Sequence, residues 1–133
     1  MLLSRKMKTR QLLTILALTI LPALSRADDL IETYTAVLSE RDHYNSSGER
    51  LKEAAAIIRQ DRANFHKFGK RDKGDESDTF FANARNREIL ERFLNRGRST
   101  ASALNAIING TPVVVVRIYR ADSGDNYINV SVQ

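Results

Sequence analysis

Four acidic side chains share one short segment of the chain, KRDKGDESD at 70–78, and carboxylates gathered on a flexible loop are ligands that calcium prefers. These residues are Asp72, Asp75, Glu76 and Asp78. Their spacing is not that of an EF-hand loop, and the basic residues between them would neutralise a cation site. We therefore interpret the segment as a solvated loop in which Ser77 or Asp78 caps the next helix. A calcium site is the open alternative.

Two histidines are the other residues that could do chemistry. His43 follows Asp42 in a loop-like segment, and His66 lies near the end of a predicted helix. A zinc site needs three or four ligands, yet the chain has no cysteine and no histidine pair at helical spacing. Serines lie close to His43, but no glycine pattern of a nucleophile elbow surrounds them. We therefore assign no catalytic, cofactor-binding or metal-binding residue, and we expect no cofactor.

One stretch of the predicted helix, 59–68, is rich in side chains that make directed hydrogen bonds. The planar guanidinium groups of Arg59 and Arg62 could bind a carboxylate or a phosphate. Ordinary surface ion pairs of about 0–1 kcal/mol are the favoured interpretation of these two arginines. Phe65 falls on the apolar side of the helix, which predicts a place in the core.

The first 27 residues have the pattern of a cleavable signal peptide. A basic start is followed by an apolar stretch, 12–24, and by Ser25-Arg26-Ala27, which places cleavage after Ala27. The apolar stretch is shorter than the roughly 20 residues that a membrane-spanning helix needs. An uncleaved anchor is the alternative. The pattern predicts export to a bacterial periplasm or to the cell exterior, without membrane association after cleavage.

The predicted cleavage removes the chain's apparent excess of positive charge. Five of the 21 basic residues and none of the 16 acidic residues lie in 1–27, so 28–133 is formally neutral. A neutral chain lacks the electrostatic footprint of a nucleic-acid-binding protein, and we expect no nucleic-acid partner. The absence of cysteine excludes a disulfide framework. We expect 28–133 to be one small domain that is stabilised by burial alone.

Three segments of this predicted domain show helical periodicity. The first places Leu30, Tyr34, Val37 and Leu38 on one face. A longer helix is expected to begin at a capping box with Ser46 as N-cap, and to end where Gly69 adopts a left-handed conformation. A third apolar segment runs from Phe80 to Gly97. Its asparagines could cap an internal restart, so one helix and two helices are both open.

The end of the chain changes to strand-like sequence. Residues 111–120 are dense in β-branched side chains, and 127–133 alternate apolar and polar residues around a turn at 121–126. Asn109-Gly110 is a strong hairpin signal. Whether 103–108 form a strand or a helix stays open. The predicted fold is α+β, with two or three N-terminal helices packed on a C-terminal antiparallel β-hairpin or three-stranded meander.

The valine-rich strand suggests how the protein acts. If Val114 and its alternate neighbours face the core, then Val113, Val115 and Tyr119 share the opposite face, which is more apolar than a solvated surface requires. Either another part of the chain covers this face, or a protein partner binds there or at an exposed strand edge. The favoured function is therefore a small exported, non-catalytic binding domain of the accessory, adaptor or inhibitor type. The alternative is a small exported hydrolase or metal-dependent enzyme that uses Asp42, His43 and His66.

Overall fold

The computed structural model describes residue 22 and residues 27–133. The predicted signal peptide and its cleavage site lie almost wholly outside the described residues. The elements in chain order are β1 (Asp29–Val37), η1 (Glu40–His43), α1 (Ala54–His66), η2 (Phe80–Ala82), α2 (Ala84–Glu88), α3 (Leu90–Arg96), α4 (Ala101–Asn109), β2 (Val113–Arg120) and β3 (Asn126–Val132).

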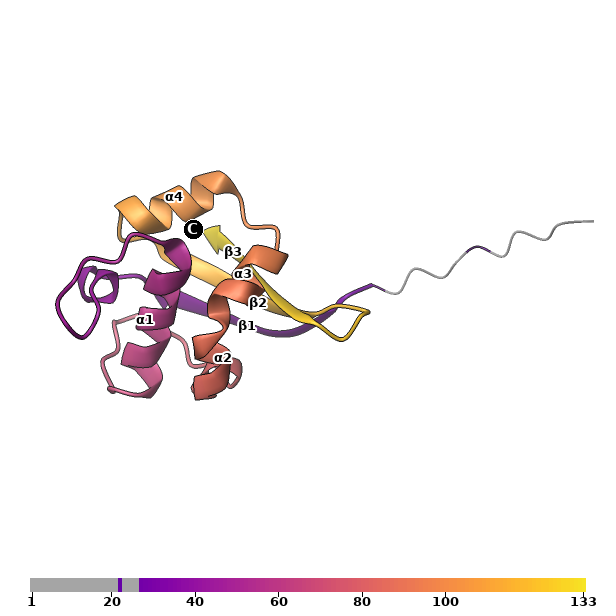
Figure 1. The fold of residues 1–133 in the computed structure, drawn as a ribbon, viewed down its shortest axis with the longest axis horizontal. Helices are drawn as coiled ribbons and strands as arrows, with labels where there is room; N and C mark the ends of the chain where they lie inside the picture. The colour runs from indigo at the N-terminus through magenta and orange to yellow at the C-terminus, as the bar shows by residue number, and fades with distance from the viewer. Residues whose placement is uncertain (1–21, 23–26) are drawn as a thin grey trace, which may run out of the picture.

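The three strands form one antiparallel sheet in the order β1-β2-β3, and the helices lie together on one side of it (Figure 1). The central strand is β2. Its Val116 is paired with Tyr34 of β1 on one side and with Val130 of β3 on the other. The predicted fold is wrong in its arrangement. The strands come from both ends of the chain and the helices from its middle, so the sheet is not a C-terminal hairpin beneath N-terminal helices.

The first predicted helix is the strand β1. Its apolar residues satisfy a period of two better than a helical period, because Tyr34, Ala36 and Leu38 are all fully buried. Leu30, which the helical interpretation placed on the buried face, is 54% exposed. The sheet register shifts between Leu30 and Glu32, so the strand is irregular at its start.

The long helix begins later than its predicted capping box. Asn45 Oδ1 accepts hydrogen bonds from the backbone N–H groups of Ser47 and Glu49, which closes a turn where the helix was expected to start. The segment then pairs back at Tyr44 and Arg50 before α1 begins at Ala54. The predicted end of the helix is close, since α1 stops at His66 and Gly69 has a left-handed φ of 65°.

The segment from Phe80 to Gly97 is broken, as its asparagines allowed. The side chain of Asn83 accepts a hydrogen bond from the backbone N–H of Asn86 and caps α2, and α3 follows after Ile89. The open segment 103–108 is helical and belongs to α4, which Thr100 caps. The hairpin signal at Asn109-Gly110 is wrong, because these residues join α4 to β2.

The hydrophobic core lies between the sheet and the helices. The hairpin of β2 and β3 is confirmed, with Val114, Val116 and Ile118 fully buried on the helical side. α1 contributes Ile57 and Ile58 to the same cluster. Among the described residues, no helix combines the length and the apolar composition that crossing a membrane would need.

Candidate functional site

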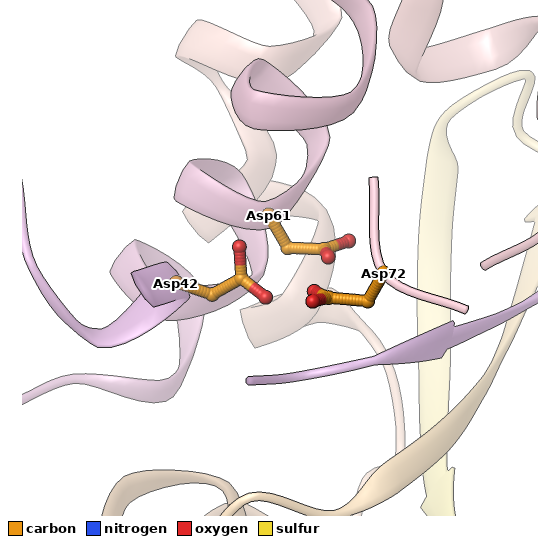
Figure 2. A group of neighbouring side chains, drawn as sticks. All are labelled: Asp42, Asp61 and Asp72. Atoms are coloured by element: carbon orange, nitrogen blue, oxygen red, sulfur yellow. The ribbon is translucent and has the colours of Figure 1, made fainter. Parts of the chain in front are cut away.

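Three carboxylates from separate parts of the chain lie close together where η1, α1 and the loop after α1 meet (Figure 2). Asp42 comes from η1, Asp61 from α1 and Asp72 from the loop that follows α1. One oxygen of each lies within 4.8 Å of the others, and Asp42 and Asp61 are each only 1% exposed. Oxygen ligands at such spacing are what a hard divalent cation requires, so these three residues could hold one.

Protein donors already engage these carboxylates. Asp42 accepts hydrogen bonds from Asn64 Nδ2 at 2.8 Å and from the Ser39 backbone N–H at 3.0 Å. Asp72 accepts from Arg41 Nη2 at 2.9 Å and from Ser39 Oγ at 2.7 Å. A cation would have to replace or share these bonds. These hydrogen bonds join η1 to α1 and to the loop that follows α1.

Burial makes the ionised form of the carboxyl groups in this cluster costly. Burial raises the pKa of Asp61 well above its ordinary value, although the neighbouring Arg62 opposes the shift. Burial also raises the pKa of Asp42, against the hydrogen bond from Asn64. Because Asp42 and Asp61 are close together and shielded from water, states in which one of the two carboxyl groups keeps its proton are favoured.

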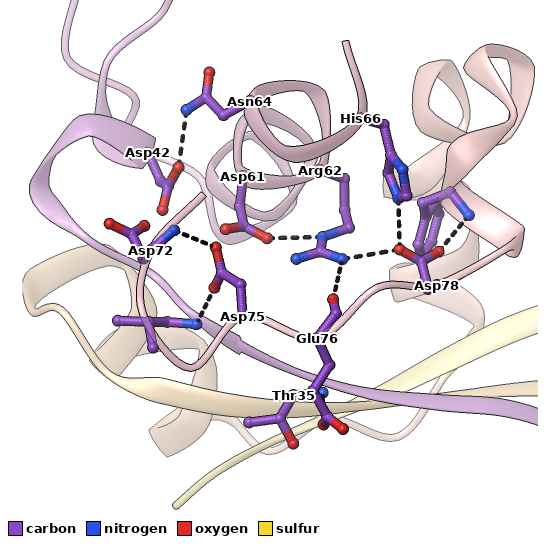
Figure 3. Close-up of polar contacts among 12 residues, drawn as sticks. Thr35, Asp42, Asp61, Arg62, Asn64, His66, Asp72, Asp75, Glu76 and Asp78 are labelled. Carbon is purple, nitrogen blue, oxygen red and sulfur yellow. Dashed lines mark hydrogen bonds and ion pairs between the residues drawn. The ribbon is translucent and has the colours of Figure 1, made fainter. Parts of the chain in front are cut away.

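An ion-pair network continues from the cluster along α1 (Figure 3). Arg62 donates through Nε to Asp61 at 2.8 Å and through Nη1 to Asp78 at 2.8 Å. His66, one turn further along α1, places Nε2 2.7 Å from the same Asp78 oxygen. The network fixes α1 against the loop that leads to η2.

Arg62 is the centre of this network, and its predicted place on the surface is wrong. Its side chain is fully buried, with the guanidinium carbon 4.2 Å from the ring centre of Tyr34 and 4.6 Å from that of Phe65. The prediction that Phe65 lies in the core is confirmed. Arg59, on the same helix, is exposed as expected.

The four acidic residues of the candidate calcium loop do not converge on one point. Asp75 Oδ1 accepts from the backbone N–H of Val37, and Glu76 Oε1 accepts from that of Thr35, each at 2.8 Å (Figure 3). Asp78 turns instead toward Arg62, and its other oxygen accepts from the backbone N–H of Phe81 at the start of η2. The loop therefore protects the free edge of β1 and caps η2.

The structure separates the residues of the alternative enzyme. Nδ1 of His43 lies 2.8 Å from the carbonyl oxygen of Ser39, and Nε2 lies 2.8 Å from that of Ile107. Neither ring nitrogen is therefore free to take a proton from a substrate or to bind a metal. Asp42 belongs to the carboxylate cluster, whereas His66 contacts Asp78, which the sequence did not connect with it.

A shallow hollow of about 570 Å³ adjoins His66. Its lining includes Ser77, Asp78 and Glu32. Because Asp78 is fully buried and contacts Nε2, it holds the imidazole in one orientation. This is the part of the described chain in which a histidine, a carboxylate and a hydroxyl share one opening.

The outer face of the sheet carries the residues that predicted a partner. Val113, Val115 and Tyr119 alternate with the buried residues of β2 and are half-buried. The ring of Tyr119 stacks on that of Tyr127 in β3, with centroids 5.1 Å apart. The helices lie on the other side of the sheet (Figure 1). Val113, Val115 and Tyr119 thus lie on the side of β2 opposite its buried residues, and no helix among the described residues covers them.

The comparisons with known proteins give no family for this chain. No protein-family model, curated protein or solved structure matches it. The geometry of the described residues is therefore what indicates function.

The network around Arg62 was not predicted from the sequence. A buried arginine is uncommon, and Arg62 lies next to Asp61 and three residues before Phe65, on the side of the helix that carries apolar residues. That position was the available signal, because the same helical spacing that buries Phe65 also buries Arg62.

Proposed function

We propose that this protein is a small exported, non-catalytic domain that binds another protein through the open face of its sheet. We define the open face by the residues of β2 and β3 that point away from the helices: Val113, Val115, Arg117, Tyr119, Tyr127, Asn129 and Ser131. One observation carries the proposal. The helices cover one side of a three-stranded sheet, and the other side bears two valines and a tyrosine pair.

Burial supports this choice of surface. An open antiparallel sheet ordinarily alternates apolar residues toward the core with polar residues toward water. β2 departs from this rule at Val113 and Val115, whose outward side chains are apolar and only half-buried. Protein interfaces favour aromatic residues and arginine, which Tyr119, Tyr127 and Arg117 supply.

Export is the second part of the proposal. The signal-peptide pattern of 1–27 supports a periplasmic or secreted protein, and the formal neutrality of 28–133 disfavours a nucleic-acid partner. The hydrogen-bonded state of His43 and the lack of any assembled set of Asp42, His43 and His66 favour binding over catalysis.

The test uses the full chain with a C-terminal tag, expressed in its own cells, crosslinked briefly and recovered with its partner. In the variant with Val113→Lys and Val115→Lys, we expect loss of a stoichiometric partner while the circular dichroism spectrum and the unfolding midpoint stay near those of the wild type. The matched control is Asn95→Lys, an exposed position on α3, which lies on the helical side of the sheet. Full recovery of the partner by the double variant would contradict the proposal. Unfolding of the double variant would assign these valines to the core.

A second function has one specific observation in its favour. The contact of His66 with buried Asp78 in the hollow beside Ser77 is the arrangement in which a carboxylate orients a general base. An exported hydrolase would use His66 to activate a hydroxyl or a water there. Hydrolysis of p-nitrophenyl acetate by the purified 28–133 chain tests it, with His66→Gln as the variant and Lys67→Gln as the control. Equal rates for all three proteins would exclude His66 as the base.

A further inference from the structure

The two edges of the sheet differ in how much of their backbone is covered. On β1, Asp75 and Glu76 form hydrogen bonds with the backbone groups of Thr35 and Val37 that point away from β2. On β3, the backbone N–H of Val130 donates to Ser99 Oγ at 2.9 Å. The loop thus blocks strand addition at Thr35 and Val37 of β1, whereas a polypeptide can add a strand where β3 is left uncovered.

The uncovered part of β3 follows from its pairing with β2. The backbone N–H of Gln133 donates to the carbonyl oxygen of Val113 at 2.9 Å, so 133 and 113 form a hydrogen-bonded pair. Because antiparallel pairs alternate, the N–H and C=O of Val132 and the C=O of Val130 point away from β2. No described residue forms a hydrogen bond with these three groups.

A groove runs beside these free groups. It has a volume of about 430 Å³ and lies between the start of α4 and the end of β3. Thr100, Ser102, Ala103 and Ala106 line its helical side, and 129–132 line its strand side. These helical side chains are short, which leaves room for a second backbone to approach the edge of β3.

The charge of the groove has one sign. Arg98 and Arg117 are the charged residues among those that line it, and none of the lining residues is acidic. Arg117 Nη1 donates to Ser131 Oγ at 3.2 Å, whereas Arg98 has no ion pair with any described residue. A carboxylate placed in the groove would meet two guanidinium groups, which bind carboxylates through paired hydrogen bonds.

We infer that this groove binds an extended segment of a partner protein that carries acidic side chains and pairs with Val130 and Val132 as a fourth strand. In such a strand alternate side chains face Ala103 and Ala106, while the others face Arg117. The free edge at Val130 and Val132 lies apart from Val113 and Val115 of the open face. The groove shares Arg117, Asn129 and Ser131 with that face, and the added strand would extend it.

The probe is a synthetic eight-residue peptide of alternating valine and glutamate, with both ends blocked. Two control peptides are compared with it. One has glutamine in place of every glutamate, and the other is the glutamate peptide N-methylated at alternate residues. Binding is followed by amide chemical shifts of the 28–133 chain. We expect shifts confined to 98–106, Arg117 and 128–133, at least about tenfold tighter binding for glutamate than for glutamine, and loss of binding on the N-methylation that blocks pairing.

Two variants locate the interaction on the protein. The change Arg98→Gln with Arg117→Gln should remove the preference for glutamate, whereas the exposed control Arg120→Gln should keep it. Val132→Pro deletes the outward N–H without touching the ladder to β2, so the fold should persist and binding should fall.

Three outcomes would overturn the inference. They are no shifts at about 1 mM peptide, equal binding of the glutamate and glutamine peptides, and a dimer of this chain that Val132→Pro dissociates. The first two would exclude an acidic strand, and the third would show that a second copy occupies the edge. Each leaves the partner test on Val113 and Val115 standing, because neither valine lines the groove.

Discussion

Arg62 Nη1 donates to Asp78 Oδ1 at 2.8 Å, and neither side chain is exposed to solvent. The pair connects the middle of α1 to the loop that protects the edge of β1. Arg62 also binds Asp61, so the guanidinium stands between two buried carboxyl groups (Figure 3). A buried charge is costly once its partner is removed, and this makes the pair the most sensitive polar contact of the fold.

Removing one partner of this pair should destabilise the protein strongly. For Arg62→Met we expect the free energy of unfolding to fall by about 3–5 kcal/mol, because two buried carboxyl groups lose their cation. Urea denaturation at neutral pH measures it. Arg59→Met, an exposed position on the same helix, is the control and should change the free energy by about 0.5 kcal/mol or less. A loss below about 1 kcal/mol at Arg62 would show that the buried charges are relieved in another way.

Stability should depend on pH through Asp61 and Asp42. The pKa of each is raised in the folded state, so the folded protein holds more protons than the unfolded chain. Their contribution is fully present below the ordinary aspartate pKa, and it is lost as the pH rises through the raised values. Asp61→Asn keeps an oxygen for Arg62 and removes one titration. Between about pH 4 and 7 its free energy of unfolding should decline less than that of the wild type in urea denaturation.

The control for this pH profile is Asp122→Asn, which lies in the exposed turn between β2 and β3. Its profile should follow the wild type over the whole range. Identical profiles for Asp61→Asn and the wild type would show that Asp61 has an ordinary pKa in the folded protein.

The sequence predicts those parts of the fold in which one periodicity dominates. The strands at 113–120 and 126–132 alternate without ambiguity, and the structure confirms their hairpin. β1 is ambiguous, because Leu30, Tyr34 and Leu38 satisfy a helical period while Tyr34, Ala36 and Leu38 satisfy a period of two. The exposure of Leu30 resolves it, and exposure depends on the partner strand far along the chain.

The polar network could not be predicted from local patterns. Asp42, Asp61 and Asp72 meet only after β1 pairs with β2 and the loop at 70–79 folds against β1. Local spacing favoured a solvated loop, with a calcium site from Asp72, Asp75, Glu76 and Asp78 as the open alternative. Long-range pairing instead gives all four side chains structural partners. The burial of Arg62 likewise depends on Asp78 across a long loop.

The hydroxyl of Tyr34 should be dispensable. Its oxygen is buried and has no hydrogen-bond partner among the described residues, and burial raises the pKa of the group well above its ordinary value. Tyr34→Phe keeps the ring beneath Arg62 and removes an unsatisfied polar atom. We expect the free energy of unfolding to stay the same or to rise by up to about 1 kcal/mol in urea denaturation.

The matched control for this change is Tyr127→Phe, which removes the exposed hydrogen bond from Tyr127 Oη to Asp28 Oδ2 at 2.6 Å. That variant should lose about 0.5 kcal/mol or less. A loss of more than about 1 kcal/mol for Tyr34→Phe would show that the Tyr34 hydroxyl is hydrogen-bonded in solution.

Gly97 should be the glycine that tolerates substitution least. It ends α3 with an ordinary φ of −81°, so a left-handed conformation is not what requires glycine here. A Cβ at this position would lie 1.8 Å from the carbonyl oxygen of Ile128. The Cβ is fixed by the backbone of Gly97, and the oxygen belongs to the backbone of Ile128, so α3 and β3 would have to separate. Gly97→Ala should therefore lower the free energy of unfolding by about 3 kcal/mol or more.

Gly110→Ala provides the comparison, because a Cβ there would meet its nearest described neighbour, the carbonyl oxygen of Ala106, at 3.2 Å. We expect a change of less than about 1 kcal/mol for that variant in the same urea denaturation. The separation forced by Gly97→Ala should also release the hydrogen bonds from Arg98 N–H to Asn129 and from Val130 N–H to Ser99. Amide exchange at Arg98 and Val130 should therefore accelerate in Gly97→Ala and stay slow in Gly110→Ala, and unchanged exchange in both would refute the close packing of α3 on β3.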